Sequence, residues 1–72
     1  MPEKTFGNVL QELRREQGLT QEELAFRSSL DRTYISLLER GLRVPTIDTL
    51  FKVSKSLGTK PEDLVARIEA GR

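Results

Sequence analysis

The sequence predicts an all-α protein of five short helices around one core. Gly18, Gly41 and Gly58 each follow a run of apolar residues with helical spacing, and glycine is favoured at helix ends because it accepts a left-handed backbone. Residues that can cap a helix precede these runs. No alternating run of β-branched residues and no hairpin signal predicts a strand. The 72 residues have the length of one small domain, which we expect to span residues 1–72.

The first helix is expected to begin after Thr5, to run for about 12 residues and to end at Gly18. The second begins at the segment "TQEE". There Thr20 can cap the helix while the Glu23 side chain bonds back to the cap, a reciprocal pair called a capping box. The apolar residues assigned to the core are Phe6, Val9, Leu10 and Leu13 in the first helix and Leu24 and Ala25 in the second.

Only the segment "SSL" separates the second helix from the third, and this length permits only a sharp turn. Asp31 is a good cap for the third helix, which is expected to run to Arg40. Helical spacing divides this helix into two faces. The face expected to be buried contains Leu30, Ile35 and Leu38. The opposite face contains Arg32, Thr33, Ser36, Leu37 and Arg40.

The fourth and fifth helices follow the loop "LRVP", where Pro45 disfavours helix in the residue before it. Thr46 is the expected cap of the fourth helix, which ends at Gly58. Thr59 is the expected cap of the fifth helix, with Pro61 in its first turn and Glu62 completing a capping box. The apolar residues are Ile47, Leu50, Val53 and Leu57 in the fourth helix and Leu64, Val65 and Ile68 in the fifth.

The composition argues against an enzyme. The sequence contains neither cysteine nor histidine, which removes disulfides, the usual zinc ligands, thiol nucleophiles and the commonest general base. It also has no glycine-rich phosphate loop. We expect no metal and no cofactor, and 72 residues leave no room for a domain that senses a small-molecule ligand. No apolar run approaches the roughly 20 residues of a membrane span, so we expect a cytoplasmic protein without membrane contact.

Positive charge is concentrated in the middle of the chain. The net charge of the whole sequence is only +1, but residues 24–60 carry +4, whereas residues 1–23 carry −2 and residues 61–72 carry −1. A basic segment of this kind is typical of a surface that binds nucleic acid. The competing interpretation is that these side chains only solvate exposed helix faces.

Two helices joined by a tight turn, at about residues 20–40, fit the helix-turn-helix unit, whose second helix lies in the DNA major groove. The stretch "GLTQEELAFRSSLDRTYISLLERGLRVPTIDTLFKVSKSLG", residues 18–58, resembles the Cro and phage-repressor type of helix-turn-helix domain, the XRE family. The segments "LTQEELA" and "YISLLERG" look like the signature segments of that family. The resemblance implies a lambda-repressor-like DNA-binding fold.

The resemblance also implies roles for individual residues. Gln21 matches the position that holds a DNA phosphate at a helix N-terminus, and Arg40 and Arg43 match positions that touch the DNA backbone. Arg14 and Glu39 match a structural ion pair between the first helix and the end of the third. The positions that match the base-reading face are Arg32, Thr33, Ser36 and Leu37.

One residue departs from the family pattern. The turn position that is often glycine in the family is Ser29 in this sequence. A left-handed backbone at a serine would store a strain of about 1 kcal/mol.

The chemistry of the outward face leaves several alternatives open. Arg32 can donate two parallel hydrogen bonds to guanine O6 and N7, or it can remain a solvated charge. Thr33 and Ser36 are short enough to bond a base edge, a phosphate or only water. Leu37 can contact a thymine methyl group or pack beside the adjoining helix. Tyr34 can contact a phosphate through its hydroxyl, or its ring can be partly buried.

The predicted function is that of a sequence-specific DNA-binding transcriptional regulator. One recognition helix reads only a few base pairs, so we expect a homodimer on palindromic double-stranded DNA. Phe51, Val65 and Ile68 are the candidate interface residues; the competing interpretation is that Val65 and Ile68 complete the core of a monomer. The alternative function is that of a protein-interaction module or antitoxin with the same fold.

Overall fold

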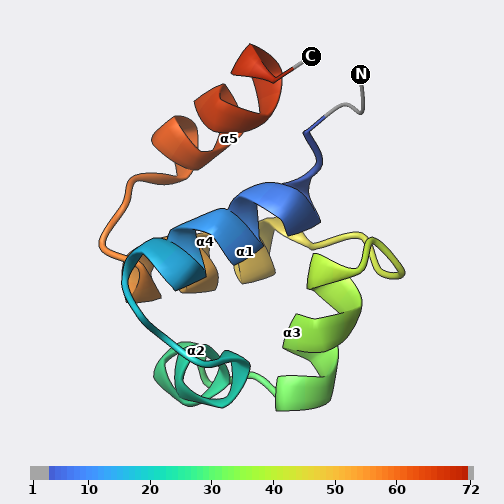
Figure 1. Ribbon diagram of the computed structural model, residues 1–72, viewed down its shortest axis with the longest axis vertical. Coiled ribbons are helices and arrows are strands. Elements are labelled where there is room, and N and C mark those ends of the chain that lie inside the picture. Colours follow the sequence, from blue (N-terminus) through green and yellow to red (C-terminus); the bar gives the residue numbers. More distant parts are fainter. Residues whose placement is uncertain (1–3, 72) are drawn as a thin grey trace.

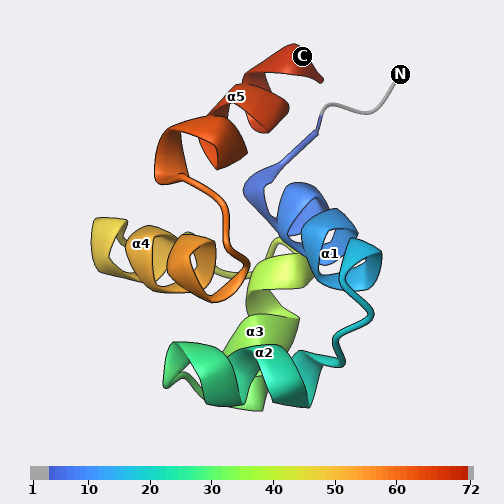
Figure 2. The same ribbon diagram turned by 90° about the vertical axis from the view of Figure 1, so that its left-hand side faces the viewer.

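The computed structural model describes residues 4–71 and confirms the all-α prediction. Within that range the chain forms five helices and no strand. The helices are α1 (Phe6–Glu16), α2 (Gln21–Ser28), α3 (Arg32–Glu39), α4 (Ile47–Ser56) and α5 (Pro61–Ala70) (Figure 1). The helix α5 lies at one end of the molecule and the α2–α3 pair at the other, with α1 and α4 at the level between them (Figures 1 and 2). None of the helices in residues 4–71 is long and apolar enough to span a membrane.

Threonine side chains start three of the helices, as the sequence predicts. The hydroxyl of Thr5 accepts a hydrogen bond from the Asn8 N–H at 3.1 Å, and the hydroxyl of Thr46 accepts one from the Thr49 N–H at 3.1 Å. At the start of α2, both hydrogen bonds of the Thr20–Glu23 capping box are present, at 2.9 and 3.0 Å. These bonds satisfy backbone donors that a helix N-terminus otherwise leaves without a partner.

Two of the predicted caps differ from the structure. Asp31 occupies the cap position of α3, but its side chain makes no capping hydrogen bond. The prediction for Thr59 was wrong, because α5 begins one residue later, with Lys60 at the cap position. The physical reason is that the Thr59 N–H closes the end of α4 by donating to the Ser54 carbonyl at 3.0 Å. Thr59 therefore belongs to the end of α4, and Glu62 does not complete a capping box.

A residue with a left-handed backbone ends each of the first four helices. Gly18, Gly41 and Gly58 have φ angles of 68°, 74° and 66°, and Ser29 has a φ angle of 56°. After each one, the next N–H donates back to a carbonyl five residues earlier, at 2.9 to 3.0 Å. This arrangement satisfies carbonyls of the last helical turn and reverses the chain sharply. It produces the short connections that the glycine pattern predicts.

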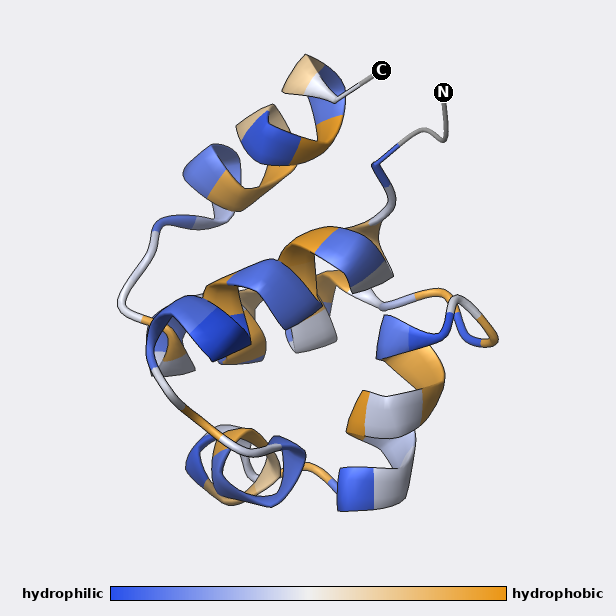
Figure 3. Cartoon of the chain, viewed as in Figure 1, coloured by the Kyte–Doolittle hydropathy of each residue, from blue (hydrophilic) through white to orange (hydrophobic). Residues whose placement is uncertain are grey.

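All five helices enclose the core, and each contributes at least one buried apolar side chain. The fully buried apolar side chains include Val9, Leu10, Leu24, Ile35, Leu38, Val53 and Leu64. Apolar and polar segments alternate along the helices (Figure 3). Gly7 permits the close packing of α1 on α3, because a Cβ atom there would collide with the backbone carbonyls of Leu38 and Glu39.

The assignment of Ile47 to the core was wrong. Its side chain is 66% exposed, and Thr49, with 5% exposure, lies inside instead. Ile47 is the first residue of α4, and the inward face of this helix is centred on Val53 and Leu57. At about 100° per residue, Ile47 lies roughly a quarter turn from that centre. It therefore lies on the surface between α4 and α5.

Candidate nucleic-acid interface

The outward face of α3 carries three polar residues and one apolar residue. Two fully buried side chains, Ile35 and Leu38, hold the helix against the core. Their burial turns the opposite face outward, where Arg32 and Thr33 are exposed and Ser36 and Leu37 are half-buried. Arg40, one turn after Ser36, is exposed at the end of the helix. The structure thus brings all four predicted base-contacting residues together on one side of one helix.

The predicted phosphate-contacting residues surround this face but differ in their surroundings. Arg43 is exposed in the loop between α3 and α4. Gln21 is the first residue of α2, and its side-chain amide donates a hydrogen bond to Glu39 at 3.0 Å. The hydroxyls of Tyr34 and Thr49 lie 3.2 Å apart, which joins α3 to the start of α4. The ring of Tyr34 also packs against the core, so its partial burial is present, while its phosphate contact stays a prediction.

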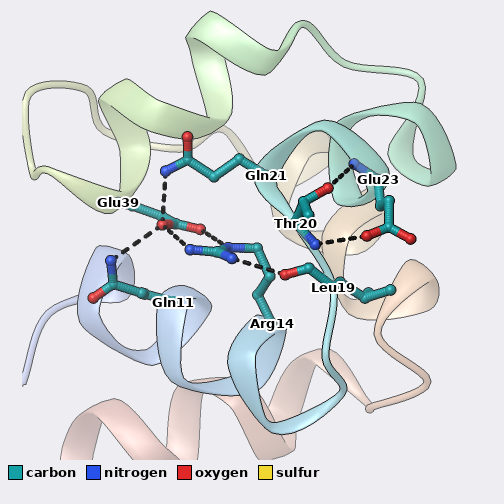
Figure 4. Close-up of polar contacts among 7 residues, drawn as sticks. All are labelled: Gln11, Arg14, Leu19, Thr20, Gln21, Glu23 and Glu39. Carbon is teal, nitrogen blue, oxygen red and sulfur yellow. Dashed lines mark hydrogen bonds and ion pairs between the residues drawn. The ribbon is translucent and has the colours of Figure 1, made fainter.

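A buried carboxylate at the end of α3 joins three helices. Glu39 accepts hydrogen bonds from the Arg14 Nε and Nη2 atoms at 2.7 and 3.0 Å. Gln11 and Gln21 donate to its Oε1 atom at 3.4 and 3.0 Å. Arg14 in turn donates to the Leu19 carbonyl at 2.8 Å, at the entry to α2 (Figure 4). The sequence predicts the ion pair of Arg14 and Glu39; it gives no signal for the two glutamines.

This network keeps Glu39 ionised. Burial by itself would raise the pKa of the Glu39 carboxyl, because a charge is less stable away from water. The hydrogen bonds from Arg14, Gln21 and Gln11, together with the positive charge of Arg14, outweigh the burial and hold the pKa of Glu39 below its ordinary value. A buried charge is tolerated in a fold when it is paired and hydrogen-bonded in this way.

A second surface, which we call the α4–α5 strip, is apolar. It consists of the exposed side chains of Ile47, Phe51 and Val65, which are 66%, 53% and 37% exposed. Beside it runs a groove lined by Phe6, Pro45, Thr46, Ile47, Leu50, Val65 and Ile68. Ile68 is half-buried and packs against the core. The sequence predicts Phe51 and Val65 on this surface but misses Ile47, which helical spacing alone assigns to the core.

Phe26 is a further exposed aromatic residue, which the sequence analysis does not single out. It is 86% exposed on the outer side of α2, beside Glu22, Glu23 and Arg27. Its position on α2 separates it from the α4–α5 strip in the fold.

The comparisons with known proteins agree with this fold. A model of the helix-turn-helix family matches residues 10–64 of the chain. The HTH-type transcriptional regulator y4dJ from Sinorhizobium fredii is 47% identical over 62 residues, which cover 86% of this chain and 80% of the relative. The residues matched by the family model include all of α2, α3 and α4 and parts of α1 and α5.

Two solved structures of restriction-modification controller proteins have the same fold. The structure of C.AhdI from Aeromonas hydrophila matches with a TM-score of 0.80 and 44% identity, covering 82% of this chain and 89% of that chain. The controller protein C.Esp1396I was solved as a tetramer in complex with its natural 35 base-pair operator. That structure matches with a TM-score of 0.84 and 38% identity, covering 92% of this chain and 87% of that chain.

Proposed function

The chain belongs to the Cro and phage-repressor (XRE) type of helix-turn-helix transcriptional regulators, and from this membership we propose how it recognises DNA. It binds palindromic operator DNA as a homodimer, with α3 of each copy in the major groove. The observation that carries this proposal is the outward face of α3. That face presents Arg32, Thr33, Ser36 and Leu37 from a helix that two buried residues hold in place.

Within the groove, we assign Arg32 the main part in specificity. It is exposed in the first turn of α3, and its planar guanidinium can donate two parallel hydrogen bonds to guanine O6 and N7. Thr33 and Ser36 supply short hydroxyls for neighbouring base edges, and Leu37 supplies an apolar contact for a thymine methyl group. Among residues 4–71, the side chains of Arg32, Thr33 and Ser36 form no hydrogen bond, so their donors are available to DNA.

The DNA backbone is held by groups around this face. Arg40 and Arg43 are exposed cations at and after the end of α3, and such groups neutralise phosphates without reading sequence. The capping box of α2 uses the N–H groups of Thr20 and Glu23, which leaves the Gln21 N–H directed out of the helix N-terminus. A phosphate there is favoured by the helix dipole as well.

Dimerisation would place two recognition helices on one face of the DNA. Half-sites for such domains lie about 34 Å apart, one turn of the double helix. We assign the interface to the α4–α5 strip with Ile68, because Ile47, Phe51 and Val65 are exposed apolar side chains on α4 and α5 and take no part in the face of α3. Burying such a surface against a second copy stabilises both chains. The tetrameric assembly of C.Esp1396I on its operator supports self-association on DNA for a protein of this fold.

Two of the solved relatives suggest one class of target genes. C.AhdI and C.Esp1396I are both restriction-modification controllers, and we propose that this chain controls a restriction-modification operon. Sequencing the genomic fragments that the purified protein retains is the test. Fragments upstream of restriction or methyltransferase genes support the proposal, and enrichment of unrelated promoters contradicts this part while leaving DNA binding intact.

The decisive experiment selects bound sequences from a random DNA pool and repeats the selection with Arg32→Ala. We expect the wild-type protein to select a palindrome and the variant to lose preference at one position in each half-site. That preference corresponds to about 1 to 3 kcal/mol per guanine. Unchanged preference in the variant would remove Arg32 from its assigned role.

Arg43→Ala is the matched control, because it also removes one exposed arginine. We expect it to weaken binding to all DNA sequences about equally. The slope of the logarithm of affinity against the logarithm of salt concentration should fall by about 1, the value for one lost phosphate contact. A protein-interaction module would behave differently, since its affinity for a protein would change little with salt. A wild-type chain that selects no sequence and shows no salt-dependent DNA binding would favour that alternative.

A further inference from the structure

Gln21 and Glu39 are the first and last residues of the α2–α3 pair, 18 positions apart in the sequence, and a hydrogen bond joins them. Gln21 is the first residue of α2, and Glu39 is the last residue of α3. The turn at residues 29–31 joins the opposite ends of these helices. An eight-residue helix is about 12 Å long, so the turn lies well away from the Gln21–Glu39 hydrogen bond. The two connections therefore fix the α2–α3 pair at separate places.

The orientation of the Gln21 amide is determined by its partner. An ionised carboxylate only accepts hydrogen bonds, so the Nε2 atom faces Glu39 Oε1 at 3.0 Å and the amide oxygen points away from Glu39 (Figure 4). Glu39 itself is fixed by Arg14, whose side chain lies buried between α1 and the entry to α2. Gln21 thus attaches the start of α2 to an acceptor that cannot rotate freely.

From this geometry we propose that Gln21 is a positioning residue for base reading, which sets the angle of α3 against α2 by holding Glu39. This inference rests on the proposed function, since it concerns how the recognition helix meets the major groove. Gln21 reads no base itself. Its removal lets the C-terminal end of α3 shift relative to α2, and the base contacts of α3 lose their alignment.

This role differs from that of a phosphate contact, and the two are separable by measurement. A phosphate contact contributes to the binding of every DNA sequence about equally. A positioning residue contributes mainly to the selected sequence, because only that sequence depends on aligned base contacts. The ratio of the affinities for selected and unrelated DNA is therefore the informative quantity.

The experiment compares Gln21→Met with Gln11→Met. Methionine keeps the length of glutamine but removes the amide donor. Gln11 is the matched control, because it donates to the same Oε1 atom at 3.4 Å but comes from α1, so it does not link α2 to α3. For Gln21→Met we expect the ratio of selected to unrelated affinity to fall about tenfold, as for one misplaced base contact. For Gln11→Met we expect no change in that ratio.

A spectroscopic measurement provides a second readout. In the free wild-type protein, the side-chain amide resonance of Gln21 should shift as Glu39 is titrated with acid, because the two groups are hydrogen-bonded. Followed through the resonance of the Glu39 carboxyl carbon, an acid titration of Gln21→Met should give Glu39 a higher pKa than in the wild type, since one of the hydrogen bonds that lower it is removed. Thermal unfolding verifies that each variant is folded under the binding conditions. If Gln21→Met is not folded, Gln21→Asn, whose amide is too short to reach Glu39, replaces it.

Three outcomes would overturn the inference. They are an equal loss of affinity for selected and unrelated DNA, an equal fall of the ratio in Gln11→Met, and a Gln21 resonance that does not respond to Glu39. A wild-type protein that selects no sequence would instead refute the proposed function, so the two failures are distinguishable.

Discussion

Ser29 is the residue whose backbone carries the clearest strain. Among residues 4–71 it is the non-glycine residue with a positive φ angle, 56°, where an L side chain is disfavoured. It occupies the same place at the end of α2 that glycines occupy at the ends of α1, α3 and α4. Its side chain is exposed, so the strain has no compensation in packing.

We predict that Ser29→Gly stabilises the protein by about 0.5 to 1 kcal/mol, because glycine adopts this conformation without a Cβ clash. Denaturant unfolding at neutral pH measures the difference. Gly41→Ser is the reverse change at the end of α3, where nothing lies within 4 Å of an added Cβ. It should destabilise by a similar amount, about 1 kcal/mol. Destabilisation by Ser29→Gly would show that the serine has a role beyond the turn.

The hydrogen bonds of individual side chains were predicted well where their partners are close in the sequence. The Thr20–Glu23 capping box spans only four residues and is present as predicted. Tyr34 was left open between two interpretations, and its contact with Thr49 joins residues that are 15 positions apart. No local pattern contains the information for such a contact.

The relative placement of the helices α1, α2 and α3 depends on the carboxylate of Glu39. Glu39 and Arg14 are both buried, with 7% and 8% exposure, and their closest atoms are 2.7 Å apart. Breaking a buried pair leaves the remaining charge without a partner, which is more costly than the pair is favourable. The arrangement of these helices should therefore respond both to mutation and to acid.

We predict that Glu39→Gln destabilises the protein at pH 7 by about 3 kcal/mol or more, because Arg14 stays charged and buried. The pKa of Glu39 is lower in the folded than in the unfolded state. Its contribution is therefore fully present above the ordinary glutamate pKa of about 4.3 and is lost as the pH falls through the lower folded value.

Urea unfolding of the wild-type and Glu39→Gln proteins between pH 7 and pH 3 measures this effect. The difference in stability should be largest at pH 7 and should shrink in acid, as the wild-type carboxyl becomes protonated. The pKa values of Glu16 and Glu23 are also lowered, by Arg67 and by the Thr20 backbone N–H. Glu16 and Glu23 are present in both proteins, so their contributions cancel in the difference between the two free energies of unfolding. A difference that stays constant with pH would contradict the assignment.

The sequence predicted most helix boundaries, and the start of α5 was the exception. Starts and ends depend on hydrogen bonds within about five residues, which the sequence displays directly. The exception was α5, where Thr59 closes α4 instead of opening the next helix. Two local signals competed for one residue there, and the closing bond of α4 prevailed.

For the molecule as a whole, the exposed apolar side chains indicate which surface contacts a second copy. Besides the α4–α5 strip, Phe26, Leu42 and Val44 are exposed apolar side chains. The strip differs from them because Ile47 and Val65 line one groove together with the half-buried apolar side chains of Phe6, Leu50 and Ile68. Contiguous exposed apolar surface is typical of an interaction site, whereas a single exposed side chain is common on any protein.

We predict that Ile47→Lys shifts the protein from dimer to monomer in sedimentation experiments at micromolar concentration. The variant should bind a palindromic site more weakly but a single half-site about as well as the wild type. Phe26→Lys adds the same charge on α2 and serves as the matched control, with no change in oligomeric state expected. A wild-type protein that stays monomeric on a palindrome would refute the dimer, and equal effects of both variants would refute this interface.

Helix periods, caps and glycine ends are local properties of the chain, so the five helices, the helix-turn-helix and the outward position of Arg32, Thr33 and Ser36 could be predicted from the sequence. The hydrogen bond from Gln21 to Glu39 and the exposure of Ile47 are seen only in the folded chain. Those facts depend on how helices distant in sequence pack together. Burial and polar contacts between helices are properties of that packing, and no short stretch of the sequence contains them.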